Sequence, residues 1–245
     1  QDTTVTNHEF KEFVDATGYI TEAEKFGDSF VFHLADISEN ASCCQVHTEL
    51  PWWHLVKGAS WKHPFGTGSD FIDNHPVVHV SRNDALAYCN WKGVRLPTEQ
   101  EWEFAARANT NTRFPWGDDF LINGEYNANI WQGNFPSLNT KKDGYLFTAP
   151  VKTYTPNNFG LYQMIGNVWE WCANKAPIDL ETLVKENPKD IWEKNKHYSD
   201  EKYAIRGGSF LCHDSYCKRY RVHSRNSQFA TSSSSNLGFR VVRDI

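Results

Sequence analysis

The sequence predicts an α+β fold with little regular secondary structure, formed by one domain over residues 1–245. Short amphipathic segments with helix start and stop signals occur beside short apolar runs typical of strands, and long loops with Gly, Asn and Pro separate them. The 10 Trp, 10 Tyr and 16 Phe against a single Met indicate a core of rigid aromatic side chains. A chain of 245 residues can bury such a core without help from disulfides.

The predicted helices are bounded by residues with capping chemistry. The first is expected between Thr6 and Gly18, the second between Ser81 and Gly93, and the third from Thr98 onward. Thr6 and Thr98 are each followed at the third position by a glutamate, which is the spacing of a capping box, and a glycine ends a helix by adopting a left-handed conformation. Apolar residues share one face of each segment, so each helix should pack that face inward.

Short β-branched and aromatic runs are predicted as strands. They are "DSFVFHL" (28–34), "HPVVHV" (75–80), "APVKTY" (149–154), "YAIRGGSF" (203–210) and "GFRVVRD" (238–244). The charged and Pro-broken span 175–199 is expected to be a surface excursion.

Charge and hydropathy exclude two classes of partner. A net charge of -5 argues against a nucleic-acid footprint, although residues 218–225 form a local positive cluster. No apolar run approaches the roughly 18 to 20 residues of a membrane helix. The polar opening "QDTTVTNHEF" is not a signal peptide, and the start looks trimmed. Neither nucleic acid nor a membrane is therefore expected as a partner.

The stretch "SFLCHDSYCKRYR" holds Cys212 and Cys217, two of six cysteines. A disulfide closing so short a loop would stabilise the fold by only roughly 2 kcal/mol, which is a weak reason for the pair. A structural zinc site needs four N or S ligands, and His213 should point to the opposite face of a strand from Cys212. Two thiolates that converge on one soft ion suit Cu(I), and the positive cluster would favour the thiolate forms. A disulfide stays open as the alternative.

Blocks along the chain, from about Val5 to Asp244, resemble in order the formylglycine-generating enzymes, or sulfatase-modifying factors. They include "TGYITEAEKFGDSFVF", "PWWHLVKGASWKHP", "NHPVVHVSRNDALAYCNW", "RLPTEQEWEFAARA", "GLYQMIGNVWEW" and "RGGSFLCHDSYCKRYR". The blocks "RLPTEQEWEFAAR" and "GNVWEW" occur across a wider superfamily and identify the fold better than the activity. The cysteine pair is the more specific feature.

This resemblance implies a fold related to C-type lectin-like domains and an oxidation carried out on another polypeptide. In that reaction O2 converts a cysteine in a Cys-x-Pro-x-Arg motif of a sulfatase to Cα-formylglycine, and an external thiol supplies electrons. The partner implied is an unfolded or nascent sulfatase, and the enzyme is expected to be a monomer.

The resemblance also implies roles for residues around the pair. Cys212 and Cys217 would bind Cu(I), the substrate cysteine would join as a further thiolate, and O2 would react at the copper. Disulfide exchange between Cys217 and the substrate is the alternative route. The resemblance assigns catalytic positions to Ser209, Tyr216 and Arg225, and substrate-binding positions to Trp169, His213 and Asn236.

Two Ca²⁺ sites are implied in the same way, since oxygen-rich loops suit a hard cation. The first would use Asn129, the carbonyl of Ile130, Asp143 and the carbonyl of Tyr145. The second would use Gln163, the carbonyls of Gly166 and Val168, and Glu170. Gln163 departs from the asparagine of the animal enzymes, so the second site is the weaker prediction.

The remaining cysteines bear on the compartment. Animal family members pair cysteines at the positions of Ala106 and Val222, and of Cys89 and Val241, and both bridges are missing here. Their loss favours the cytoplasm and predicts that Cys89 is a buried, reduced thiol. The sequon Asn40-Ala41-Ser42 keeps a secretory lumen as the alternative.

Two other functions compete with the oxidase. An inactive paralogue could act as a binding or regulatory module, but such relatives lack the cysteine pair. An iron-dependent sulfoxide synthase needs a three-histidine set on a helical-bundle domain, for which this chain shows no sequence.

Overall fold

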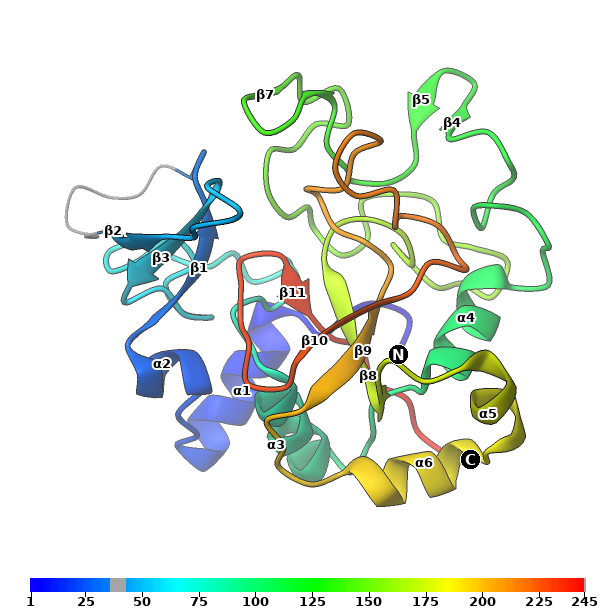
Figure 1. Ribbon diagram of the computed structural model, residues 1–245, viewed down its shortest axis with the longest axis horizontal. Coiled ribbons are helices and arrows are strands. Elements are labelled where there is room, and N and C mark those ends of the chain that lie inside the picture. Colours follow the sequence, from blue (N-terminus) through cyan, green and yellow to red (C-terminus); the bar gives the residue numbers. More distant parts are fainter. Residues whose placement is uncertain (36–42, 245) are drawn as a thin grey trace.

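A four-stranded sheet forms the centre of the molecule, in a computed structural model that describes residues 1–35 and 43–244 (Figure 1). The helices are α1 (Asn7–Thr17), α2 (Glu22–Phe26), α3 (Arg82–Lys92), α4 (Glu99–Arg107), α5 (Leu180–Lys185) and α6 (Pro188–Asn195). The longer strands are β1 (Asp28–Phe32), β2 (Cys43–Val46), β3 (Trp53–Lys57), β8 (Trp169–Lys175), β9 (Lys202–Arg206) and β10 (Asn226–Phe229). The two-residue strands are β4 (Leu121–Ile122), β5 (Glu125–Tyr126), β6 (Gly133–Asn134), β7 (Leu138–Asn139) and β11 (Leu237–Gly238).

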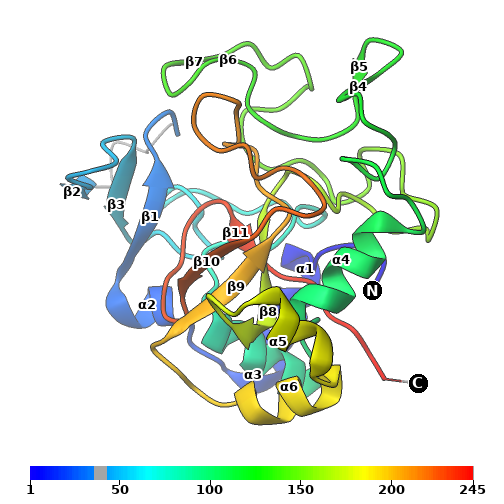
Figure 2. The same cartoon turned by 45° about the vertical axis from the view of Figure 1, so that its right-hand side comes forward.

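The central sheet has the order β10-β9-β8-β11, and a smaller sheet has the order β1-β3-β2. Strand β8 pairs antiparallel with β9 and parallel with β11. In Figure 2, α3, α5 and α6 lie together below the central sheet, and the hairpins β4–β5 and β6–β7 lie above it. Most of the described chain lies outside helices and strands, which confirms the predicted α+β class with little regular structure.

The three predicted helices are confirmed with their caps. Helices α1 and α4 begin with complete capping boxes at Thr6 and Thr98, and α1 and α3 end at Gly18 and Gly93, which have φ of 65° and 67°. Helix α2 was not predicted, although its own capping box starts at Thr21.

Several strand predictions are wrong. Residues 75–80 and 149–154 form no strand, and within 238–244 only Gly238, in β11, and a single bridge at Val242 belong to a ladder. The valines at 77, 78 and 80 are buried, but their segment bonds to different loops, Val77 N to Val5 O at 2.9 Å and His79 N to Ser234 O at 3.0 Å. An apolar run therefore marked burial here and not sheet pairing.

The span 175–199 is largely exposed, as expected of a surface excursion, but it is not irregular, since it contains α5 and α6. Asp179 and Asn187 cap these helices, and Leu183, Ile191 and Trp192 turn inward to the main core. Within the described residues, no helix combines the length and apolar composition that a membrane crossing needs.

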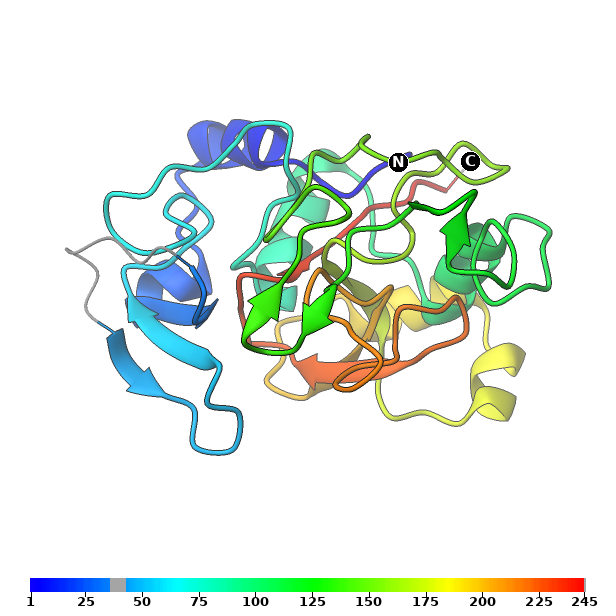
Figure 3. The same cartoon turned by 90° about the horizontal axis from the view of Figure 1, so that it is seen from above.

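Aromatic rings fill the core, as the composition indicated. Phe10 contacts Phe13, Trp61, Tyr88 and Phe239 with ring centroids between 5.3 and 6.4 Å apart. The first residue lies beside the C-terminal segment, where the Gln1 amino group donates to the Val241 carbonyl at 3.0 Å, and in Figure 3 that segment runs past the N-terminus.

A buried ion network joins helix α4 to the central sheet. Glu99, in the first turn of α4, accepts from Arg206 at 3.2 Å and from Arg225 at 3.0 and 2.6 Å. Arg206 ends β9, and Arg225 directly precedes β10. Burial alone would raise the pKa of Glu99, but hydrogen bonds from Arg225 and Asn174 and the charge of Arg206 hold it below its ordinary value.

Replacing Glu99 by Ala should therefore lower the free energy of unfolding by about 3 kcal/mol, because a buried pair broken on one side leaves an uncompensated charge. Urea denaturation at neutral pH measures this. Glu181→Ala is the matched control, since Glu181 pairs with Lys185 on an exposed helix surface and its loss should change little. Equal, small effects of both substitutions would show that the network is not a stabilising element.

Candidate functional site

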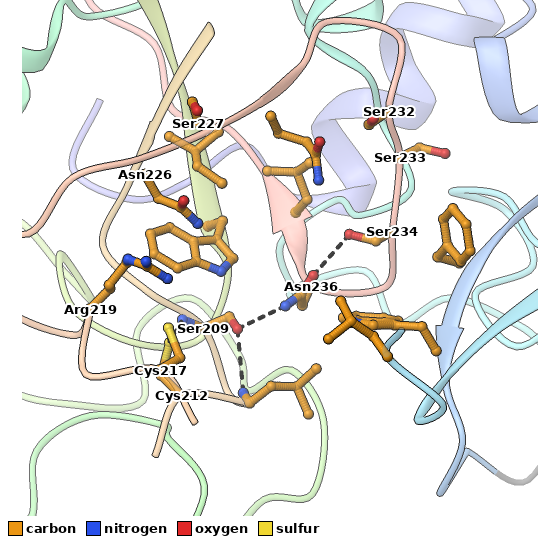
Figure 4. Close-up of a pocket in the computed structure, with 18 of the residues that line it drawn as sticks. Ser209, Cys212, Cys217, Arg219, Asn226, Ser227, Ser232, Ser233, Ser234 and Asn236 are labelled. Carbon is orange, nitrogen blue, oxygen red and sulfur yellow. Dashed lines mark hydrogen bonds between the residues drawn. The ribbon is translucent and has the colours of Figure 1, made fainter. Parts of the chain in front are cut away.

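A pocket of about 550 Å³ opens between the central sheet and the smaller sheet (Figure 4). Its walls come from the loop after β9, from β10, from the loop before β11 and from β1 and β3. The described lining residues include Trp169, Ser209, Cys212, Tyr216, Cys217, Arg219, Ser233, Ser234 and Asn236. Arg219 is the one permanently charged side chain among them, and none of the described lining residues is a carboxylate.

Cys212 and Cys217 lie at one end of the pocket as a reduced pair. Their sulfur atoms are 2.9 Å apart, and both thiols are free and buried. The prediction that this stretch is a strand is wrong, since it consists of tight turns, with Cys212 N bound to Ser209 O at 2.9 Å and Cys217 N to His213 O at 2.8 Å. Residues five apart in a strand would point to opposite faces, so the turns are what bring the sulfurs together.

Two glycines before the pair let the sulfur approach the backbone closely. Gly207 and Gly208 have φ of 94° and 78°, which L side chains rarely adopt. A Cβ at Gly208 would lie 3.2 Å from Cys212 Sγ and 3.0 Å from Tyr220 Cα. The "RGG" of the sequence is therefore a requirement of the cysteine loop.

The two thiols have opposite tendencies to ionise. A hydrogen bond from Cys212 lowers the pKa of Cys217 to about 7, against the opposing effect of burial and with support from the N–H and charge of Arg219. Burial raises the pKa of Cys212 well above its ordinary value. Near neutral pH Cys217 is therefore partly ionised, and its thiolate form accepts the Cys212 proton in a hydrogen bond.

A chain of neutral polar groups runs from the pair along the pocket floor. Ser209 Oγ accepts from Leu211 N at 3.3 Å and from Asn236 Nδ2 at 2.9 Å, and Ser234 Oγ donates to Asn236 Oδ1 at 2.8 Å. Both acceptor positions of Ser209 are filled, so its own proton is free to point into the pocket. Trp169 N donates to Asn236 O at 2.8 Å and its ring lines the same wall.

Of the residues that the resemblance assigned to the site, the structure brings Ser209, Tyr216, Trp169 and Asn236 to the pocket with the cysteines. The ring of Tyr216 stacks on Phe135 with centroids 4.3 Å apart. The structure does not place the other two among the lining residues. His213 Nδ1 bonds Ser215 Oγ at 2.8 Å, and the guanidinium of Arg225 is held by Glu99.

Sequence reasoning missed Arg219 as an individual residue, although it lies in the positive cluster 218–225. It also missed Ser233, whose only signal was the serine run before Asn236.

The first predicted calcium loop has oxygen donors, and Asp143 forms no ion pair among the described residues. Asn129 Oδ1 is buried and has no hydrogen-bond partner in the described part of the chain. Asp143 accepts only from neutral N–H groups there, those of Ile130, Gln132 and Tyr145 at 2.6 to 3.1 Å, and burial raises its pKa. Gln132, which sequence reasoning missed, also donates to Ile130 O. A half-buried carboxylate beside an unpaired amide oxygen fits a hard cation.

The second predicted calcium loop is electrostatically different. Gln163 Oε1 is unpaired among the described residues, but Glu170 is bound by Arg240 at 2.6 and 2.8 Å and by Trp102 Nε1 at 2.7 Å. Its charge is already compensated, so these residues do not fit a divalent cation as the first loop does. Site two therefore rests on the resemblance alone.

The other described thiols lie away from the pocket. Cys89 and Cys172 are free and fully buried, and burial raises the pKa of Cys172 well above its ordinary value. The sequon Asn40-Ala41-Ser42 lies outside the described residues. Among the described residues, no group of three or more His, Cys, Asp or Glu side chains gathers as a metal site.

Comparisons with known proteins agree with one another. The family model described as "Sulfatase-modifying factor enzyme 1-like domain" matches residues 1–245. A "Formylglycine-generating enzyme" of Streptomyces coelicolor is 49% identical, over 99% of this chain and 77% of that protein. The mouse protein of the same name is 48% identical, over 98% of this chain and 64% of its own length.

An "Inactive C-alpha-formylglycine-generating enzyme 2" of Bos taurus is also similar, at 41% identity over 96% of this chain and 73% of that protein. Among solved structures, PvdO from Pseudomonas aeruginosa has a TM-score of 0.69 at 24% identity, covering 100% of this chain and 79% of its own. At that identity the likeness shows the shared fold.

Cys217 should be alkylated by iodoacetamide with a midpoint near pH 7, as followed by mass spectrometry of its peptide. Its folded pKa of about 7 lies below the ordinary value of 9.0, so between these values it is ionised in the fold and neutral in the unfolded chain. The stability that this contributes is present above pH 9 and is lost as the pH falls toward 7.

Arg219→Gln and Cys212→Ala should both move that midpoint upward, because each removes a group that favours the thiolate. Lys218→Gln is the matched control and should leave it in place. A midpoint near 9 in the unmodified protein would contradict the assignment of the thiolate to Cys217.

Proposed function

This chain belongs to the sulfatase-modifying factor enzyme 1-like family, and on that premise we propose that it oxidises a cysteine in a Cys-x-Pro-x-Arg motif of a sulfatase to Cα-formylglycine. The observation that carries the proposal is the reduced pair Cys212 and Cys217, 2.9 Å apart at one end of a pocket of about 550 Å³. Relatives named as formylglycine-generating enzymes at 48 to 49% identity support it.

The proposed reaction balances with an external thiol as the reductant. One peptidyl cysteine thiol, one O2 and two reductant thiols yield one peptidyl aldehyde, one hydrogen sulfide, one water and one disulfide. The substrate carbon is oxidised, O2 is reduced to the aldehyde oxygen and to water, and the two reductant thiols supply the remaining electron pair. The hydrated aldehyde then serves as the sulfatase nucleophile.

The cysteine pair fits Cu(I) as its metal. Two sulfur donors with no other His, Cys, Asp or Glu gathered beside them in the described residues suit a soft, low-coordinate ion and not zinc or a hard cation. Cu(I) held by Cys212 and Cys217 would supply the one-electron redox chemistry that lets O2 react with a thiol.

The chain's own residues prepare the substrate sulfur. The Cys217 thiolate and the neighbouring Arg219 charge define the end of the pocket where a thiol enters and loses its proton. Ser209 holds a free hydroxyl proton beside Cys212 and can donate it to a developing negative charge. The ring of Tyr216 lines the pocket, stacks on Phe135 and meets Trp52 edge-on, and these contacts fix its position.

An inactive binding module is the second candidate, since one inactive relative is 41% identical. Such a module has no need of a lowered thiol pKa inside a pocket. The geometry of Cys212 and Cys217 therefore favours the enzyme.

The Cu(I)-reconstituted protein should convert the cysteine of a Cys-x-Pro-x-Arg peptide when it is incubated with the peptide, O2 and excess thiol. Mass spectrometry should show that the peptide loses hydrogen sulfide and gains one oxygen atom. Cys212→Ser and Cys217→Ser should each lower the rate of conversion by more than about 100-fold. Loss of a residue that only supports a metal ligand costs up to about 100-fold, and loss of the ligand itself should cost more. Cys89→Ala, a buried thiol outside the pocket, is the control and should retain activity.

An unchanged peptide that nevertheless binds would favour the binding module. A disulfide between Cys217 and the peptide, trapped without reductant, would support the exchange route over coordination alone.

We also propose that Asn129, Ile130, Asp143 and Tyr145 hold a structural Ca²⁺. Excess Ca²⁺ over EDTA should raise Tm by about 5–10 °C, the range expected for a saturated site in a chain of this size. Asp143→Asn should abolish this rise, yet in EDTA the variant should be at least as stable as the wild type, because it removes a half-buried carboxylate that no cationic side chain pairs among the described residues.

Differential scanning fluorimetry reports both effects. Asp15→Asn is the control, since Asp15 is an exposed helix residue paired with Lys11. An equal Tm of the wild-type protein in Ca²⁺ and in EDTA would contradict the proposed Ca²⁺ site.

A further inference from the structure

A second hydrogen-bond chain reaches the pocket from the interior, opposite the cysteines. His79 Nδ1 lies 2.8 Å from Ser29 Oγ, and Ser29 Oγ lies 2.7 Å from Ser233 Oγ. Ser233 lines the pocket, and Figure 4 shows it on the far side from Cys212 and Cys217, with Asn236 between them. None of the functional roles considered above involves Ser29, His79 or the Ser233 hydroxyl.

The direction of every proton in this chain follows from its inner end. His79 Nε2 lies 2.9 Å from the carbonyl oxygen of Pro64, which can only accept, so Nε2 carries the ring proton. His79 is fully buried, and burial lowers its pKa to about 4, so the ring is neutral and Nδ1 is an acceptor. Ser29 must then donate its single proton to Nδ1, and Ser233 must donate its own to Ser29.

A group that reaches the Ser233 hydroxyl therefore meets only its lone pairs. Its hydroxyl proton is committed to Ser29, and its backbone is fixed within a loop that is tied down on both sides, by His79 N donating to Ser234 O at 3.0 Å and by Ser235 N donating to Phe30 O at 2.9 Å. His79 itself has φ of 57°, a strained conformation for a residue with a Cβ. The strained backbone of His79 and the buried hydrogen bonds of Ser29 together fix the orientation of the Ser233 hydroxyl.

The occupant of such a position is a neutral hydrogen-bond donor. No carboxylate lines the pocket among the described residues, so a cationic side chain has no partner there. An extended polypeptide must pair its backbone N–H groups when it leaves water. We infer that Ser233 accepts a hydrogen bond from a backbone N–H of the substrate polypeptide at the end of the pocket opposite the cysteines, with Ser29 and His79 as positioning residues.

This inference rests on the proposed function. A measurement of peptide binding, made apart from conversion, tests the two separately. The probe is a fluorescent Cys-x-Pro-x-Arg peptide with its cysteine replaced by Ser, and fluorescence anisotropy gives its Kd. Ser233→Ala should weaken binding by about 5- to 20-fold, because a peptide N–H is left unpaired. With the cysteine peptide, KM should rise by a similar factor while kcat changes little.

Ser29→Ala should weaken binding less, since it frees the Ser233 proton without removing the acceptor. In the Ser233→Ala background Ser29→Ala should have no further effect, because it acts through Ser233. Ser199→Ala is the control, since its hydroxyl accepts from Glu201 N in a turn outside the pocket.

N-methylation of the peptide, one residue at a time, provides a test that needs no variant to fold. Methylation at one position should weaken binding of the peptide to the wild-type protein. The same methylation should not weaken binding to Ser233→Ala any further, because the acceptor is already missing there. Equal Kd values for wild type and Ser233→Ala, with the peptide still converted, would overturn this inference alone. A wild-type protein that neither binds nor converts the peptide would overturn the proposed function and this inference with it.

Discussion

The buried carboxylate of Glu99 lies between the guanidinium groups of Arg206 and Arg225, and the geometry of the pocket depends on this contact. These two arginines mark the ends of the loop that carries the cysteines, one closing β9 and the other leading into β10. A single carboxylate on helix α4 therefore fixes both ends of a loop that has almost no regular structure of its own. Arg206 also donates to Val222 O at 2.6 Å, which holds the returning part of the same loop.

Between those fixed ends, segments of the two predicted calcium loops support the cysteine pair from the other side. Trp131 N donates to Cys212 O at 3.1 Å, and Phe210 N donates to Asn167 O at 2.9 Å. Gly166 fits against the backbone of Asn129, where a Cβ would lie 2.4 Å from its oxygen. The pocket thus combines a cysteine end, where charge and a hydrogen bond favour one thiolate, with a serine end, where buried groups fix a neutral acceptor. A peptide thiol and its neighbouring backbone need those two environments.

Sequence reasoning predicted what depends on local chemistry and missed what depends on tertiary contacts. Capping boxes at Thr6 and Thr98 gave helix starts correctly, because the bonds lie within four residues. The run at 75–80 was misread as a strand, since burial without sheet pairing leaves the same apolar pattern. The cysteines were recognised through their family resemblance, but the turns that join them depend on Gly208, and the binding of Arg225 by Glu99 spans residues far apart in the sequence. No local pattern reports His79 and Ser29, which meet only in the fold.

We propose that Cys212 and Cys217 form a two-sulfur Cu(I) site to which a substrate thiol is added. X-ray absorption at the copper edge of the anaerobic Cu(I)-loaded protein measures the neighbours of the metal. The copper should have a first shell of sulfur alone, with two neighbours that become three when a Cys-x-Pro-x-Arg peptide is added. A shell containing nitrogen or oxygen neighbours, or a sulfur count that the peptide leaves unchanged, would contradict it.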